Sequence, residues 1–135
     1  QYIVMLEANL LVLQGLRREI DATATIDAQS QLMGEIKVGA GVVITRSVIR
    51  GPVIIGDGAV IKDSYIGSST SLGARSKIIH SEVSCSIVME GAVLQDVPAP
   101  IDWSLIGRDA IVNRTFEKPK ALNLILGDMS RMSIL

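Results

Sequence analysis

Residues 53–61 read Val-Ile-Ile-Gly-Asp-Gly-Ala-Val-Ile, and close variants of this stretch recur along the chain. Each variant opens with an aliphatic residue, continues with glycine, small and polar residues, and closes with an aliphatic pair. The opening residues lie roughly 16 to 18 positions apart and are Val38, Ile55, Leu72, Val88 and Ile106. This period predicts a solenoid in which each short coil stacks on the next.

Two further aliphatic series lie between these residues, and together the three series predict a coil with three sides. The second series is Ile26, Ile44, Ile61, Ile78, Leu94 and Val112, and the third is Leu32, Ile49, Ile66, Val83 and Ile101. Side chains alternate along a strand, so the residue four positions after each opening residue also points inward. For the first series these residues are Val42, Ala59, Ser76, Ala92 and Ala110, and for the third they are Ile36, Val53, Thr70 and Ile87.

The corners between the sides carry their own signature. The fourth position of the first side is Gly41, Gly58, Gly91 or Asp109, and such residues accept the positive φ that sharp corners need. The second side is one residue short in three coils, where Ser47, Ser64 and Ser81 take the inner corner. We expect these three hydroxyls to form an internal stack with a structural role.

The pattern resembles the hexapeptide-repeat family over about two thirds of the chain. The resemblance implies an all-β fold, a left-handed parallel β-helix with a triangular cross-section. We expect about five coils over residues 21–112, an N-terminal α-helix and a C-terminal strand and loop cap. The handedness comes from the resemblance alone, because the general rule for parallel crossovers favours the opposite hand.

Composition agrees with a narrow prism and excludes several partners. Hydrophobic residues make up 48% of the 135 residues and aromatic residues only 3%, so the core lacks the usual large fillers. The net charge of −1 argues against a surface for nucleic acid or for anionic membranes. No transmembrane or signal segment is evident. One cysteine excludes an internal disulfide framework and suits a reducing compartment, so we expect a cytoplasmic protein.

The two ends of the chain leave the repeat. Residues 1–20 read as a helix that stops near Gly15, with apolar residues at Leu6, Leu10, Leu13 and Leu16. This helix is too apolar to stand alone, and we expect it to cover the N-terminal end of the solenoid. Residues 113–135 form the expected C-terminal cap or tail, which closes the other end or pairs with a neighbouring subunit. Within it we expect a loop over 113–119 and strands over 121–126 and 131–135.

A narrower resemblance covers nearly the whole chain. Met5-Leu6-Glu7-Ala8-Asn9 is similar to the helix that ends the nucleotidyltransferase domain of long-form glucose-1-phosphate thymidylyltransferases. Stretches similar to their C-terminal domain and ending are residues 47–56, 63–67, 86–91, 104–107 and 124–130. The Val97-Pro98-Ala99-Pro100 stretch departs from the pattern, and there we expect a bulging loop.

This resemblance has consequences for function. It implies that residues 1–20 end a missing nucleotidyltransferase domain, which joins dTTP and glucose 1-phosphate into dTDP-glucose and pyrophosphate with a divalent metal, Mg²⁺. The Gly-rich loop, basic residues and metal-binding aspartates of that reaction are absent from this chain. The resemblance also implies a homo-oligomer, a trimer, built through the sides of the prism. We therefore expect no catalytic, cofactor or metal-binding residue in this chain.

His80 is the candidate for a different chemistry, because many hexapeptide-repeat proteins are acyltransferases with a histidine as general base between subunits. His80 precedes the inward Ser81, so it points outward, in a column with Arg46 and Asp63. The purely structural interpretation is an exposed ladder of polar side chains in which Asp63 pairs with either Arg46 or His80. An acyltransferase would bind acyl-coenzyme A in a groove near His80, but no Asn-Phe-Gly-Ala-Gly-type motif accompanies it.

The remaining candidates have structural interpretations. Cys85 lies at an outward position with no His or Asp expected beside it, which disfavours a nucleophile. The pairs Gly39/Gly41 and Gly56/Gly58 are coil corners, because no helix follows them to cradle a phosphate. Zinc-like ligand spacing is absent. Three hypotheses remain: an oligomerisation and regulatory domain of a nucleotidyltransferase, an acyltransferase, and a free-standing scaffold. The apolar character of residues 3–16 argues against the scaffold.

Overall fold

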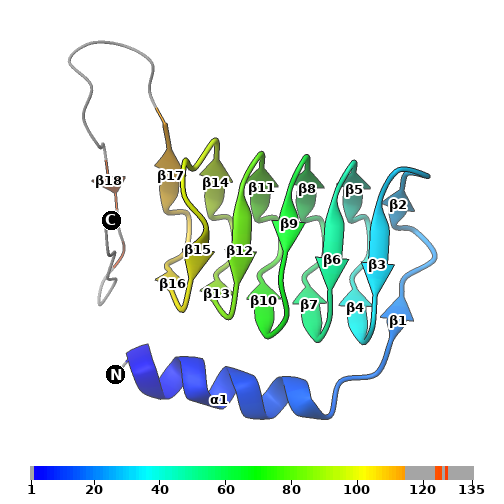
Figure 1. Ribbon diagram of the computed structural model, residues 1–135, viewed down its shortest axis with the longest axis horizontal. Coiled ribbons are helices and arrows are strands. Elements are labelled where there is room, and N and C mark those ends of the chain that lie inside the picture. Colours follow the sequence, from blue (N-terminus) through cyan, green and yellow to red (C-terminus); the bar gives the residue numbers. More distant parts are fainter. Residues whose placement is uncertain (1, 115–123, 126, 128–135) are drawn as a thin grey trace.

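The chain is a triangular prism with one helix along its side, as the ribbon in Figure 1 shows. The computed structural model describes residues 2–114, 124, 125 and 127. The helix is α1 (Tyr2–Gln14), and every strand lies in one of three sheets, here named A, B and C. Sheet A consists of β1 (Glu19–Ile20), β4 (Ile36–Val38), β7 (Val53–Ile55), β10 (Thr70–Leu72), β13 (Ile87–Val88) and β16 (Leu105–Ile106).

The other two sheets complete each coil. Sheet B consists of β2 (Thr25–Ile26), β5 (Val43–Thr45), β8 (Val60–Lys62), β11 (Lys77–Ile79), β14 (Val93–Gln95), β17 (Ile111–Asn113) and β18 (Leu124–Ile125). Sheet C consists of β3 (Gln31–Met33), β6 (Val48–Arg50), β9 (Tyr65–Ile66), β12 (Glu82–Ser84) and β15 (Ile101–Asp102). All neighbours are parallel except the pair of β17 and β18. The fold is a left-handed parallel β-helix of about six turns.

The three aliphatic series are confirmed residue by residue. Val38 pairs with Ile55 in sheet A, Ile44 with Ile61 in sheet B, and Ile49 with Ile66 in sheet C. The middle coils bury these side chains almost completely, and they form one continuous core inside the prism. Burial of apolar surface therefore fixes the register of all three sheets, since a slip of one residue would turn each strand inside out.

One prediction about the coils differs slightly from the structure, and one is wrong. The solenoid has about six turns and not about five, because β1 adds Ile20 beneath Val38 in sheet A. Ile87 does not point inward: it pairs with Ser71 on the outer face and is half-buried, whereas Ser86 is fully buried. The chain is one residue short between Val83 and Val88, so a serine takes the inner corner there, as it does on the short second sides.

The serine stack is confirmed and follows one rule. The N–H of Ser64 donates to Oγ of Ser47 (3.1 Å), and the N–H of Ser81 donates to Oγ of Ser64 (3.2 Å). Each Oγ in turn donates to the carbonyl two residues earlier, as Ser47 does to Thr45 (2.8 Å). Each hydroxyl thus replaces the backbone bond that the missing residue would have made, and a buried polar corner stays satisfied.

Glycine is required at the A–B corners for two separate reasons. Gly58 has φ +72°, in the left-handed region that favours glycine. At Gly56 a Cβ atom would lie 2.5 Å from the backbone nitrogen of Ala74 in the next coil. The prediction that these pairs are coil corners is therefore confirmed, and the close approach of successive coils accounts for the second glycine.

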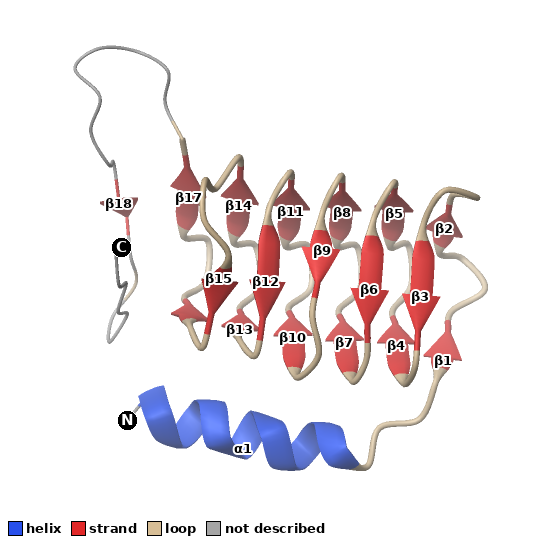
Figure 2. Cartoon of the chain, viewed as in Figure 1, coloured by secondary structure: helices blue, strands red, loops and turns tan. Residues whose placement is uncertain are grey.

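The helix lies along the side of the prism and not across its end, which corrects the expectation above (Figure 2). Asn9 anchors it to the middle of sheet A: its Oδ1 accepts from Oγ of Ser71 (2.5 Å), and its Nδ2 donates to the carbonyl of Ser69 (3.3 Å). Leu6 and Leu13 are buried on the same side of the helix. The helix ends at Gln14, just before Gly15, as predicted.

Arg18 donates hydrogen bonds to backbone carbonyls at the N-terminal end of the prism. Its Nη1 donates to the carbonyl of Gly34 (2.8 Å), and its Nη2 donates to the carbonyl of Leu32 in β3, the first strand of sheet C (3.2 Å). A guanidinium thus supplies donors where no strand precedes β3. At the other end, β18 confirms part of the strand expected over 121–126, whereas the strand expected over 131–135 lies outside the described residues.

Candidate functional site

Charged side chains of alternating sign line the corner between sheets B and C. Arg46, Asp63, His80 and Asp96 each follow a strand of sheet B and have φ between +44° and +52°. Aspartate and histidine adopt this left-handed conformation more readily than most residues. Because all four share one backbone geometry, their side chains form a column on the outside of the prism.

The lower half of this column is an ion pair. Arg46 donates to both oxygens of Asp63, from Nε to Oδ1 at 2.6 Å and from Nη2 to Oδ2 at 3.1 Å. The hydrogen bond from Arg46 lowers the pKa of the Asp63 carboxyl, and the charges of Arg46, Lys62 and His80 add to this effect. Both carboxylate oxygens of Asp63 are therefore bound by Arg46. Of the two partners that the sequence allowed, Arg46 and His80, Asp63 pairs with Arg46.

His80 pairs with Asp96, a residue that the sequence reasoning missed. Its Nδ1 lies 2.9 Å from Oδ1 of Asp96. An ionised carboxylate only accepts hydrogen bonds, so Nδ1 carries the proton and Nε2 of the neutral ring keeps a lone pair. The imidazole is 75% exposed. The two residues of this pair lie 16 positions apart, whereas those of the lower pair lie 17 apart, because the side between Val83 and Val88 is one residue short.

The coil changes length at residues 97–100, where the predicted bulging loop is confirmed. Beside this bulge the surface is hollowed to about 500 Å³. The hollow is lined by Arg46, Asp63, Ser64, Tyr65, His80, Ser81, Glu82, Val97, Pro98, Ala99 and Pro100. It therefore joins the charged column to the outer face of sheet C.

Cys85 has an acidic neighbour, contrary to expectation. Burial raises the pKa of the Cys85 thiol, and the charge and hydrogen bond of Asp102 raise it further. A raised thiol pKa reduces the thiolate fraction at neutral pH, and the thiolate is the nucleophile. The raised pKa therefore also disfavours Cys85 as a nucleophile, although Asp102 does lie beside it.

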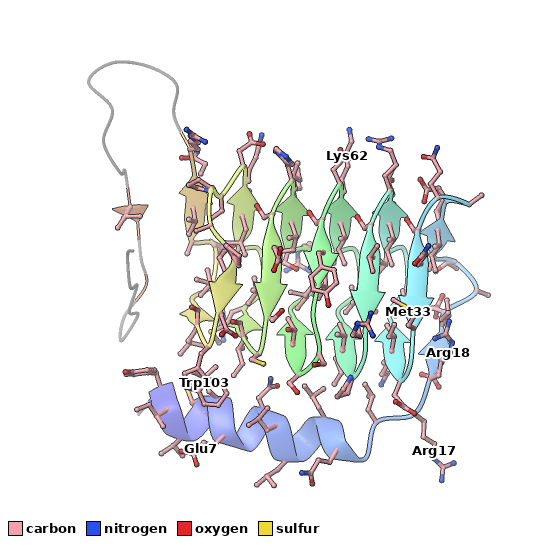
Figure 3. All side chains as sticks on the ribbon, viewed as in Figure 1. Glu7, Arg17, Arg18, Met33, Lys62 and Trp103 are labelled. Atoms are coloured by element: carbon pink, nitrogen blue, oxygen red, sulfur yellow. The ribbon has the colours of Figure 1, made fainter. Side chains whose placement is uncertain are left out.

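The outer faces of sheets A and B differ in their covering. In sheet A the outward residues Ile54, Ile87 and Leu105 are half-buried or buried, and Ser71 in the same column bonds to α1. Sheet B presents Val43, Val60, Lys77, Val93 and Ile111 outward, and no described element lies over them, although Val60 and Val93 are themselves half-buried. Val43 is 38% exposed and Ile111 42% exposed, against 7% for Leu105. Figure 3 shows Lys62 at the edge of the prism opposite α1 and Trp103 on the side facing it.

Residues 2–114 and the described positions of the tail contain no group of three His, Cys, Asp or Glu side chains that could hold a metal ion. No helix in that part of the chain combines the length and the apolar character needed to cross a bilayer.

Comparisons with known proteins point to one group of enzymes. Over 130 residues the chain is 40% identical to a glucose-1-phosphate thymidylyltransferase of Streptomyces antibioticus, and equally so to one of Streptomyces griseus. The match covers 96% of this chain but 36% of each relative, its C-terminal part. No family model matches the chain.

A solved structure shares the fold. PerB from Caulobacter crescentus, in complex with CoA and GDP-perosamine, superposes with a TM-score of 0.55 at 23% identity. The superposition covers 80% of this chain and 57% of PerB. At this identity the likeness concerns the β-helix alone. The chain is therefore a hexapeptide-repeat β-solenoid that is similar to the C-terminal part of glucose-1-phosphate thymidylyltransferases.

Proposed function

We propose that this chain is the C-terminal oligomerisation and regulatory module of a sugar-1-phosphate nucleotidyltransferase that makes dTDP-glucose from dTTP and glucose 1-phosphate. The observation that carries the assembly part is the largely apolar outer face of sheet B, over which no described element lies. The 40% identity to the two Streptomyces enzymes supports the choice of enzyme class. The described residues offer no ligand cluster for Mg²⁺, so we assign that ion and the chemistry to a preceding domain in the cytoplasm.

The proposed assembly is a trimer in which sheet B of each copy faces a common three-fold axis. Val43 and Val60 on one side of Lys77, and Val93 and Ile111 on the other, form a largely aliphatic column along the prism, and apolar surface of this kind is typical of an interface. Closed cyclic symmetry buries the same face in every copy. Sheet C does not fit this role because its outward residues include Gln31, Glu82 and Asp102.

Sedimentation velocity of the chain at micromolar concentration tests the assembly. We expect one species of three copies, and a monomer for the double variant Val60→Asp/Val93→Asp with an unchanged circular dichroism spectrum. Val48→Asp on the outer face of sheet C is the matched control and should stay trimeric. A monomeric wild type would refute the assembly, and a trimeric double variant would refute the face.

The coding DNA upstream of the Gln1 codon tests the enzyme class. We expect an open frame that continues upstream and encodes a Gly-rich loop with Arg and Lys and metal-binding aspartates. The protein made from the whole frame should release pyrophosphate from dTTP only in the presence of glucose 1-phosphate and Mg²⁺. A start codon directly upstream would remove the nucleotidyltransferase proposal and leave the assembly proposal untouched.

The bond between His80 and Asp96 favours a second candidate function, acyl transfer. With Nδ1 held by Asp96, Nε2 of His80 can take the proton from an amine or hydroxyl as it attacks the thioester carbon of acyl-coenzyme A. The new C–N or C–O bond replaces the C–S bond, and the proton leaves with the thiol. Calorimetry with acetyl-coenzyme A and an assay of His80→Ala test this candidate. Absence of binding, or activity that survives the substitution, would end it.

A further inference from the structure

The hollow beside residues 97–100 is a place where the solenoid departs from its period, and unusual residues gather there. It contains His80, the single histidine of the chain, and Tyr65, one of two tyrosines. Elsewhere on sheet C the outer face follows the repeat without a wall. The irregular loop at residues 97–100 lies beside the titratable His80 and the aromatic Tyr65. A prism with a purely structural role does not need such a loop.

One side of the hollow is apolar and rigid. Pro98, Ala99 and Pro100 form the wall, and Val83 pairs with Ile101, so Pro100 comes to lie beside Glu82. Tyr65 pairs with Glu82 on the adjacent strand, about 4.8 Å away. Tyr65 is half-buried and lines the hollow, with its ring edge directed along its own strand towards Gly67, so the phenol supplies apolar surface next to the wall.

Polar groups without a partner face the same hollow. Among the described residues, the Tyr65 hydroxyl and the Glu82 carboxylate make no hydrogen bond, and Nε2 of His80 is unused. The Tyr65 hydroxyl can both donate and accept a hydrogen bond, the Glu82 carboxylate only accepts, and the third group is the imidazole nitrogen Nε2 of His80. A ligand that uses all three must itself both donate and accept at several points.

The charge of the hollow excludes phosphate. Arg46 is the lining guanidinium and is already bound by both oxygens of Asp63, so its charge is compensated. The carboxylate of Glu82 remains, and Asp96 adds another behind His80. Because Asp96 is bound by His80, Glu82 carries the unpaired carboxylate of the lining, and this charge repels an anion.

From these observations we infer that the hollow binds the ring of a neutral sugar. A pyranose has an apolar C–H face that packs on an aromatic ring, and hydroxyls that donate to Glu82 and exchange hydrogen bonds with Tyr65 and His80. Shallow sites with an aromatic floor and a few polar groups suit such a ligand. This binding depends neither on the proposed trimer nor on acyl transfer, because it needs only one copy and no reaction.

Saturation-transfer NMR with the chain tests the inference, with glucose, methyl glucoside, glucose 1-phosphate and dTDP-glucose as probes. We expect saturation of the ring C–H protons of glucose and methyl glucoside at millimolar concentration. Glucose 1-phosphate should bind more weakly than glucose because of Glu82. If dTDP-glucose binds through its sugar, the saturation should again concentrate on the ring and not on the base.

Variants locate the site. Tyr65→Ala should weaken glucose binding by about tenfold, the order expected for removal of a packed ring, whereas Tyr65→Phe keeps most of it. Glu82→Gln should abolish the preference for glucose over glucose 1-phosphate. Val48→Ala, one strand further along the same face, is the matched control and should change nothing.

Three results would overturn the sugar site: no saturation of any probe, tighter binding of glucose 1-phosphate than of glucose, or binding that Tyr65→Ala leaves intact. Sedimentation of Tyr65→Ala separates this outcome from the proposed function, because the variant should assemble as the wild type does.

Discussion

Sheets A and B share one interior but have opposite exteriors. Inside the prism, Ile55 of sheet A and Ile61 of sheet B are equally buried, at 1% and 0% exposed. Outside, α1 lies over the outward column of sheet A, whereas no described element lies over the largely aliphatic outward column of sheet B, which Lys77 interrupts. The repeat that builds the coil therefore does not explain the outer residues, and each apolar outer column indicates a covering element. For sheet A the chain supplies that element, and for sheet B we propose a second copy.

The largest expected effect tests the shared interior. Ile55→Asp and Ile61→Asp each place a carboxylate inside the prism, at a cost of several kcal/mol in the free energy of unfolding. Urea denaturation should show similar losses for both. The outward control Lys37→Asp should stay within about 0.5 kcal/mol of wild type. A mild effect at either isoleucine would contradict the register of that sheet.

The covering of sheet A gives the next effect. Leu13→Ala removes a buried side chain between α1 and the prism, and we expect a loss of about 2 to 5 kcal/mol in the stability of the docked helix. Hydrogen exchange of the α1 amides measures it. Leu11, on the same helix but 68% exposed, is the control, and Leu11→Ala should change exchange by less than about 0.5 kcal/mol. Equal effects of the two substitutions would mean that α1 does not dock through this face.

A smaller effect of opposite sign comes from the inner corner between the two sheets. The hydroxyl of Ser76 is buried without a hydrogen-bond partner among the described residues. Ser76→Ala removes this uncompensated group, and we expect a gain of about 1 kcal/mol in urea denaturation. Ser64→Ala is the contrasting variant, because its hydroxyl accepts from the N–H of Ser81 and donates to the carbonyl of Lys62, and its loss should destabilise. Destabilisation by Ser76→Ala would point to a partner for this hydroxyl.

The smallest effect lies at the outer edge of sheet B. The pKa of Asp63 is lowered by Arg46, so this pair adds stability above the ordinary pKa of a carboxyl and loses it as the pH falls through the lowered value. Arg46→Ala should raise the pKa of Asp63 towards the ordinary value, as measured by carboxyl ¹³C titration. Arg75→Ala, at the A–B corner beside Glu90, should leave it unchanged. A lowered Asp63 pKa in Arg46→Ala would assign the effect to another group.

The interior could be predicted from the sequence because one physical rule, burial of aliphatic side chains at a fixed period, decides it. Where the period changes, the prediction was wrong. Ile87 was placed inward because the short side between Val83 and Val88 was missed. Ile20 was counted with the helix because β1 is only two residues long, too short for a pattern.

The exterior and the site depend on contacts that no period encodes. The position of α1 along sheet A depends on Asn9, whose partners Ser69 and Ser71 lie about sixty residues away. The partner of His80 was missed because the short side between Val83 and Val88 shifts Asp96 out of the 17-residue column. The hollow itself could not be predicted. The sequence indicated a bulging loop at residues 97–100 but not the face of the prism beside which this loop would lie.

The bond between Asn9 and Ser69 also bears on how the chain folds. Every parallel pairing in the prism joins neighbouring coils, as Ile44 joins Ile61, so the loop closed at each step is short and its entropic cost small. The prism can therefore grow coil by coil from any nucleus. The helix α1 comes first in the sequence, but the surface of sheet A on which it packs does not exist until several coils have formed. Its contact between Asn9 and Ser69 also closes a far longer loop than any pairing of neighbouring coils. We expect α1 to be the last element to become protected in a refolding experiment.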